Sequence, residues 1–144
     1  MAEEKKIIVF IVDDDALFLK SLETEFKLNT KSAIKTFATG EACLEHIPLN
    51  PDIIILDYYL NSVDEKAING LETLDRIKNI NKKIPVIMLS SQDKIDVAVN
   101  CMKHQAFDYI VKSETAFIRL QKAITTVFHY QEIEKALSWY MEKM

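Results

Sequence analysis

Short aliphatic runs recur along the chain and set the pattern from which its fold can be predicted. Five of them are rich in Ile, Val, Leu or Phe, and they lie at 7–12, 33–37, 52–56, 85–89 and 107–111. The run at 33–37 is the weakest of the set. Continuous apolar runs of this length predict strands that are covered on both faces, which is typical of a parallel sheet.

Between these runs, apolar residues recur at the spacing of an α-helix. In 15–28, Phe18, Leu22 and Phe26 follow one another in steps of four, which places them on one helical face. Similar spacing predicts further helices at 40–47, 70–80, 93–104 and 114–128. Strand and helix therefore alternate five times, which predicts right-handed crossovers and an α/β fold. We expect a doubly wound five-stranded parallel sheet with helices on both faces.

Two polar side chains suggest where helices begin. Asn69 stands three residues before Glu72, which is the spacing of a capping box, and Ser113 precedes the last predicted helix. We expect one domain over residues 5–128 and a helical extension over residues 129–144.

Composition and charge narrow the class of protein. A chain of 144 residues with 49% hydrophobic and 28% charged residues fits a single globular domain. Its net charge of -4 argues against direct nucleic acid binding by this chain. Cys43 and Cys101 have no metal or disulfide spacing, so we expect buried or semi-buried thiols in a reducing compartment. The start "MAEEKK" lacks the apolar core of a leader and no apolar run approaches ~20 residues, so we expect a cytoplasmic protein without membrane contact.

Polar groups follow four of the predicted strands. Acids at 13–15 follow the first run, Asp57 follows the third, Ser90 the fourth and Lys112 the fifth. Because the carboxyl ends of parallel strands meet at one edge of a sheet, these side chains are expected to gather there. Taken singly, an acid or serine after a strand is more often a helix cap, and such a lysine is usually solvated. The joint pattern is what indicates a site.

Carboxylates that share a pocket must be neutralised. Two unit charges ~4 Å apart repel by roughly 4 kcal/mol at an effective dielectric near 20. The site must protonate an acid, use Lys112, or bind a hard cation. Oxygen ligands alone suit Mg²⁺, and the lack of a nearby His or Cys argues against zinc.

The segments that carry these groups resemble the receiver domain of two-component response regulators. They are "VDDD" (12–15), "IIILD" (53–57), "IPVIMLSS" (84–91) and "FDYIVK" (107–112), and the resemblance covers about residues 5–128. It implies the flavodoxin-like strand order 2-1-3-4-5. It also implies a chain that catalyses its own phosphorylation and dephosphorylation and is not a conventional turnover enzyme.

The resemblance also implies a role for each acid. Asp57 would accept a phosphoryl group from the phosphohistidine of a sensor histidine kinase or phosphotransfer protein. Asp14 would bind Mg²⁺ with Asp57 and the backbone carbonyl of Tyr59, and Asp13 would help through a bound water. Lys112 would pair with the phosphoryl oxygens. A divalent ion and an ammonium group neutralise the oxygens of a transferring phosphoryl group, so the chemistry agrees with these roles.

Switching is implied by the same resemblance. Ser90 would donate a hydrogen bond to the phosphoryl group, and Tyr109 would change position in response. The face formed by the fourth helix, fifth strand and fifth helix would then change its partner binding. The alternative interpretation of Tyr109 is a core or edge aromatic residue without a switching role.

Three features depart from the family pattern. Ser113 follows Lys112 where the family commonly has a proline in a cis bond, and because a cis bond before a non-proline residue costs roughly 3 kcal/mol, the geometry of this turn is open. Residues 61–69, "NSVDEKAIN", form an insert that is either a tolerated surface loop or a determinant of partner recognition. Tyr59 and Gln92 stand where side chains of the family control water access to the acyl phosphate, so a bulky Tyr59 predicts slow dephosphorylation.

The C-terminal extension has apolar residues at the spacing of a coiled coil. The steps are 4, 3 and 4 between Ile133, Leu137, Tyr140 and Met144. The extension is either a longer fifth helix or a helix that leads to a dimer or output domain. A homodimer through this helix or through the switching face is a candidate partner complex.

Two other functions are alternatives to a phosphoacceptor. An Mg²⁺-dependent phosphohydrolase would need a second acid where Tyr59 stands. A pseudo-receiver that only binds partners would lack one of Asp14, Asp57 or Lys112, and this sequence has all three.

Overall fold

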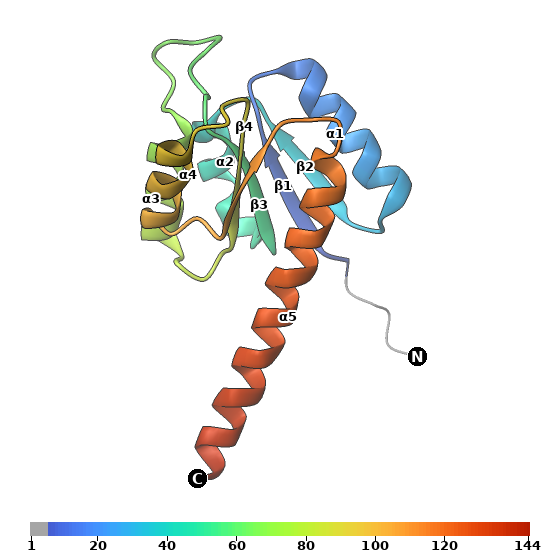
Figure 1. The fold of residues 1–144 in the computed structure, drawn as a ribbon, viewed down its shortest axis with the longest axis vertical. Helices are drawn as coiled ribbons and strands as arrows, with labels where there is room; N and C mark the ends of the chain where they lie inside the picture. The colour runs from blue at the N-terminus through green and yellow to red at the C-terminus, as the bar shows by residue number, and fades with distance from the viewer. Residues whose placement is uncertain (1–5) are drawn as a thin grey trace.

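A single parallel sheet forms the centre of the protein (Figure 1). The computed structural model describes residues 6–144, so residue 5, the expected start of the domain, and the N-terminal positions before it lie outside the described residues. The five strands run in the order β2-β1-β3-β4-β5. Their bounds are β1 Ile8–Val12, β2 Ala33–Phe37, β3 Ile53–Asp57, β4 Val86–Ser90 and β5 Asp108–Val111. The predicted fold class and strand order are confirmed.

Helices cover both faces of the sheet. They are α1 Ala16–Asn29, α2 Gly40–Glu45, α3 Gly70–Ile80, α4 Ile95–Lys103 and α5 Ala116–Lys143, with a short 3-10 turn at Ile47–Leu49. Leu74 of α3 and Cys101 of α4 belong to the core on one face, which α2 also covers. Phe26 of α1 and Leu120 of α5 belong to the core on the other face.

The aliphatic run that ends on Asp57 is the central strand. β3 pairs with β1 on one side and β4 on the other, and all five of its residues are buried. Ile54 and Leu56 pack into the core under α2, α3 and α4, while Ile53 and Ile55 pack under α1 and α5. Each such side chain contributes about 1.5–3 kcal/mol by leaving water, which explains why the run has no polar face.

Of the two predicted helix starts, the one at Asn69 agrees with the structure and the one at Ser113 does not. Asn69 caps α3, with its side-chain oxygen accepting from the amide of Glu72 at 2.8 Å. The fifth helix begins later than Ser113 suggested. It starts at Ala116, and the Ser113 hydroxyl instead contacts the Thr115 hydroxyl at 3.1 Å.

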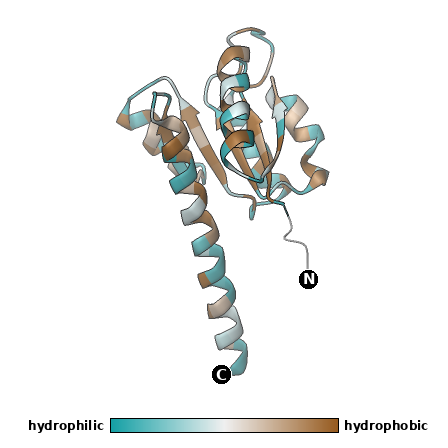
Figure 2. Cartoon of the chain, turned by 90° about the vertical axis from the view of Figure 1, so that its right-hand side faces the viewer, coloured by the Kyte–Doolittle hydropathy of each residue, from teal (hydrophilic) through white to brown (hydrophobic). Residues whose placement is uncertain are grey.

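The last helix runs past the sheet without a break. α5 continues to Lys143, so the expected boundary at residue 128 falls inside it, and Figures 1 and 2 show its second half extending away from the sheet. Every residue from 132 to 144 is exposed. Within residues 6–144, no helix combines the length and apolar character that crossing a bilayer requires.

Both cysteines are buried free thiols, as predicted. Burial raises the pKa of Cys43 to about 12 and that of Cys101 to about 11. Neither thiol is therefore a ready nucleophile.

Candidate functional site

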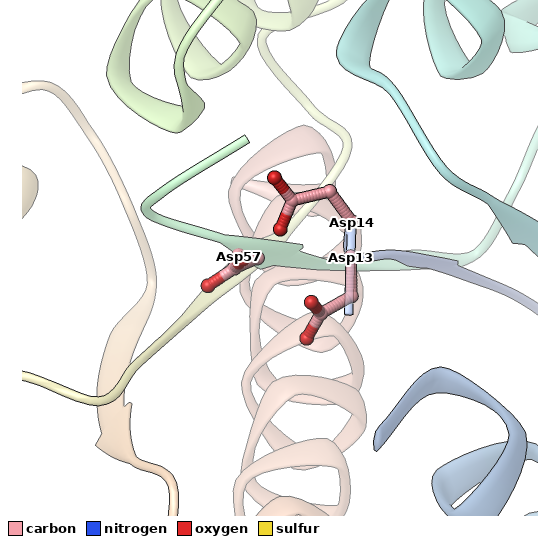
Figure 3. Close-up of side chains that lie close together, drawn as sticks. All are labelled: Asp13, Asp14 and Asp57. Atoms are coloured by element: carbon pink, nitrogen blue, oxygen red, sulfur yellow. The ribbon is translucent and has the colours of Figure 1, made fainter. Parts of the chain in front are cut away.

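Three aspartates meet at the carboxyl edge of the sheet. Asp13 and Asp14 follow β1, and Asp57 is the last residue of β3. One carboxylate oxygen from each lies within 4.8 Å of the others, and Figure 3 shows the carboxyl groups of Asp13 and Asp14 extending to the side where Asp57 lies. Asp13 and Asp57 are only 2% and 4% exposed, whereas Asp14 is half-buried. Asp15 plays a different part, because it caps α1 by accepting from the amides of Leu17 and Phe18.

Lys112 brings a positive charge to these acids from the end of β5. Its Nζ lies 2.8 Å from Asp13 Oδ2 and 3.4 Å from Asp57 Oδ1. Burial lowers the pKa of Lys112, but the contacts with Asp13 and Asp57 outweigh it, so that the pKa lies above its ordinary value. The lysine therefore stays charged at neutral pH. The bond from Lys112 to Ser113 is trans, as are all the peptide bonds of residues 6–144.

Burial and charge make Asp57 an unusual carboxyl group. Its burial, and then the neighbouring charge of Asp13, raise its pKa from 3.8 to about 7, although Lys112 opposes the shift. When all three acids are ionised, three negative charges face the single charge of Lys112. A divalent cation would balance that excess, and a donor set made only of carboxylate oxygens suits a hard cation such as Mg²⁺. The residues present thus fit a magnesium site.

Ser90, Gln92 and Tyr109 form a chain of hydrogen bonds beside the acids. Ser90 is the last residue of β4 and is fully buried, and its Oγ accepts from the amide of Gln92 at 3.0 Å. The half-buried Tyr109 of β5 donates its hydroxyl to the carbonyl oxygen of Gln92. These contacts connect the end of β4 to the aromatic ring on β5.

A cleft of about 680 Å³ opens over part of this arrangement. Asp14, Asp57, Tyr59, Gln92 and Lys112 line it, whereas Asp13, Ser90 and Tyr109 do not. Of the predicted residues, the structure brings the acids and Lys112 together, whereas Ser90 and Tyr109 lie outside the lining of the cleft. Tyr59 is 37% exposed, and its ring meets the Tyr58 ring edge-on, with 4.8 Å between centroids.

The insert contributes contacts that the sequence did not indicate. The amides of Ser62 and Val63 donate to Asp14 Oδ2 at 2.9 and 3.3 Å, and both residues line the cleft. Gly70, directly after the insert, has no space for a side chain, because a Cβ there would lie 2.2 Å from the carbonyl oxygen of Asp57. Backbone amides carry no residue signature, so the only available signal was the position of the insert directly behind Asp57.

Fold and site together define a class of protein: a doubly wound α/β domain with a cluster of three aspartates and a lysine at the carboxyl edge of its sheet. The chain belongs to the response regulator receiver domain family, whose family model matches residues 9–139.

Among its relatives, it is 32% identical over 117 residues to a protein-glutamate methylesterase/protein-glutamine glutaminase of Clostridium acetobutylicum, covering 78% of this chain and 32% of that protein. It is 31% identical over 129 residues to the DNA-binding transcriptional regulator NtrC of Escherichia coli (strain K12), covering 87% of this chain and 26% of that protein. The chain thus spans between a quarter and a third of the length of these two curated relatives.

Solved structures share the fold. A response regulator receiver domain protein from Clostridium thermocellum superposes with a TM-score of 0.76 at 23% identity, covering 88% of this chain and 98% of that one. A CheY-like receiver domain protein from Methanospirillum hungatei JF-1 gives a TM-score of 0.75 at 20% identity, covering 89% and 98%.

Proposed function

We propose that this receiver domain accepts a phosphoryl group on Asp57 from a sensor histidine kinase or phosphotransfer protein, and that the modification switches a partner-binding face. The observation that carries the proposal is the assembly of Asp13, Asp14 and Asp57 within 4.8 Å, with Lys112 contacting two of them. On this proposal the chain modifies itself and is not a turnover enzyme. A cytoplasmic location, without nucleic acid or membrane contact by this chain, stays a prediction.

The proposed transfer needs an ionised Asp57. One of its carboxylate oxygens attacks the phosphorus, the bond from phosphorus to the histidine nitrogen breaks, and an acyl phosphate remains on Asp57. Bound Mg²⁺, held by Asp14, Asp57 and the Tyr59 carbonyl with help from Asp13, would supply positive charge for the phosphoryl oxygens. Lys112 lies 3.4 Å from Asp57 Oδ1 and would pair with the same oxygens. Ser90 Oγ accepts from Gln92, which leaves its own proton free for donation.

The hydrogen bonds of Gln92 support a route for the switch. If Ser90 turns to the phosphoryl group, it releases the Gln92 amide, and the segment after β4 is free to move. The Gln92 carbonyl holds the Tyr109 hydroxyl, so that movement reaches β5. The face formed by α4, β5 and α5 would then exist in two arrangements whose balance the phosphoryl group shifts.

The second half of α5 supports the homodimer as a candidate partner complex. We propose a receiver domain over 5–128 with a helical extension over 129–144. Ile133, Leu137 and Tyr140 follow the heptad spacing and are 48%, 57% and 61% exposed. Within the described residues these apolar side chains are largely exposed to solvent. A second copy of the helix could cover them, which makes it a suitable partner.

Incubation with Mg²⁺ and acetyl phosphate tests the proposed function. Intact mass should show an adduct of about 80 Da, the mass of one phosphoryl group, and EDTA should prevent it. A chain that forms no adduct with the fresh donor would instead be a pseudo-receiver, which only binds partners.

Tyr59→Asn is expected to shorten the lifetime of the phosphorylated form by about tenfold, equivalent to about 1.4 kcal/mol in the barrier. Tyr59 lines the cleft and packs against Tyr58. On this proposal its ring would obstruct a water that approaches the phosphorus in line. Gln92 lines the same cleft and is proposed to share this control. The decay of the adduct by mass spectrometry measures the effect. Tyr130→Asn, at an exposed tyrosine of α5 outside the proposed seam, is the matched control, and an equal half-life in both variants would rule out the screening role.

A further inference from the structure

The insert at 61–69 is attached to the acidic site through backbone amides. Ser62 and Val63 donate two hydrogen bonds to one oxygen of Asp14, Oδ2, across 48 and 49 positions of sequence. Figure 1 shows the segment between β3 and α3 rising above the carboxyl edge of the sheet. A freely solvated loop would not need such contacts with a residue so distant in the chain.

Further contacts hold the insert in one shape. Leu60 before it is 1% exposed, and Ala67 within it is 8% exposed. The Asp64 carbonyl accepts from the amide of Ala67 at 3.0 Å, and the Ile68 amide donates to Glu41 Oε2 at 3.2 Å. With both ends of the insert fixed, the amides of residues 62 and 63 are presented to Asp14 at a defined place.

The two hydrogen bonds occupy only one side of the Asp14 carboxylate. Each carboxylate oxygen has two lone pairs, so Oδ1 keeps its full capacity to bind a cation while Oδ2 accepts from the insert. Hydrogen bonds to a metal-ligating carboxylate fix its orientation, and their loss typically weakens metal affinity 10–100-fold. The same carboxyl group extends to the side where Asp57 lies (Figure 3).

We propose that the backbone amides of Ser62 and Val63 are positioning groups for the cation site, holding Asp14 in the orientation in which it binds Mg²⁺. The inference rests on the proposed function, since it takes Asp14 as a magnesium ligand. It assigns the insert a role inside the site. The competing possibility is that the insert occupies Asp14 and must leave before the cation binds.

Hydrogen exchange in the unaltered protein separates these two roles. Coupling between two binding events is reciprocal, so amides that favour Mg²⁺ binding must themselves be protected by it. Saturating Mg²⁺ is expected to slow exchange of the Ser62 and Val63 amides at least severalfold, as measured by NMR. Faster exchange of these two amides in Mg²⁺ would show competition and overturn the proposal.

Proline variants test the same point through affinity. Ser62→Pro removes one donor, and calorimetric titration with MgCl₂ should give a dissociation constant 10–100-fold weaker than that of the unaltered chain. Ser62→Ala keeps the amide and Glu65→Pro places a proline elsewhere in the insert, so both should bind within about twofold of the unaltered chain. Val63→Pro provides a second test if Ser62→Pro folds poorly.

The outcomes distinguish this inference from the proposed function. If the unaltered chain binds no Mg²⁺, the proposed function fails. If the unaltered chain binds Mg²⁺ and the well-folded Ser62→Pro binds it equally well or more tightly, only the positioning role is overturned. Thermal unfolding in EDTA shows whether Ser62→Pro stays folded at the temperature of the titration after losing this hydrogen bond, which separates positioning of Asp14 from general loss of the fold.

Discussion

Asp57→Asn is expected to abolish the phosphoryl adduct. The carboxylate of Asp57 ends the central strand, contacts Lys112 and lines the cleft. It is therefore the acid that a phosphoryl donor can reach while Lys112 neutralises the negative charge of the donor. Asparagine has nearly the same shape but lacks the anionic oxygen that attacks phosphorus. Adduct formation should therefore fall below detection under conditions in which the unaltered chain is fully modified, as measured by intact mass with acetyl phosphate and Mg²⁺.

The matched control is Asp93→Asn. Asp93 is an exposed aspartate in the segment between β4 and α4, so this variant makes the same chemical change close to the site. It should be modified at the rate of the unaltered chain. Peptide mapping of the adduct gives an independent readout, and a phosphoryl group that persists in Asp57→Asn would assign the acceptor to another side chain.

The fold was accessible from sequence because its signals are local and repeated. The runs at 7–12 and 52–56 predicted strands within a residue or two, since buried parallel strands need apolar side chains on both faces. Asn69 marked the start of α3 because a cap is a side-chain feature. The start of α5 was less accessible, because Ser113 contacts Thr115 instead of capping the helix.

The candidate site was only partly accessible. Parallel topology alone places Asp13, Asp57 and Lys112 at one edge, and the structure gives their distances. The amides that Ser62 and Val63 donate to Asp14 could not be predicted, because every residue except proline has an amide and the fold of an insert decides where it points. The link from Ser90 through Gln92 to Tyr109 likewise depends on two backbone groups of one residue.

Asp57→Asn is also expected to stabilise the metal-free protein, by an amount that depends on pH. In the folded state, burial and the charge of Asp13 raise the pKa of Asp57 from 3.8 to about 7. Between these values the folded chain keeps a proton that the unfolded chain has lost. The free energy of unfolding of the unaltered chain therefore falls as pH rises through this window, and the loss is complete above about pH 7.

The size of this effect follows from the shift. Each pKa unit corresponds to about 1.4 kcal/mol, so the shift sets an upper limit of about 4 kcal/mol, and we expect Asp57→Asn to gain about 2–4 kcal/mol at pH 8 in EDTA. At pH 4.5, less than one pH unit above the ordinary pKa of 3.8, the unaltered chain has lost only about 1 kcal/mol of this stability, so the two chains should differ by about that amount. Urea unfolding at both pH values measures the free energy of unfolding of each chain. The titration of the other acids largely cancels when one value is subtracted from the other.

Magnesium should narrow or reverse the difference in free energy of unfolding between Asp57→Asn and the unaltered chain. A ligand that binds only the folded state stabilises it by about 2.7 kcal/mol at a concentration 100 times its dissociation constant. The unaltered chain offers three carboxylates and should gain this amount, whereas Asp57→Asn offers two and should gain much less. Asp93→Asn should follow the unaltered chain in EDTA and in Mg²⁺. Two results at pH 8 would contradict a buried Asp57 whose charge is compensated by the cation. One is an equal free energy of unfolding for the two chains in EDTA, and the other is a difference that stays unchanged when Mg²⁺ is added.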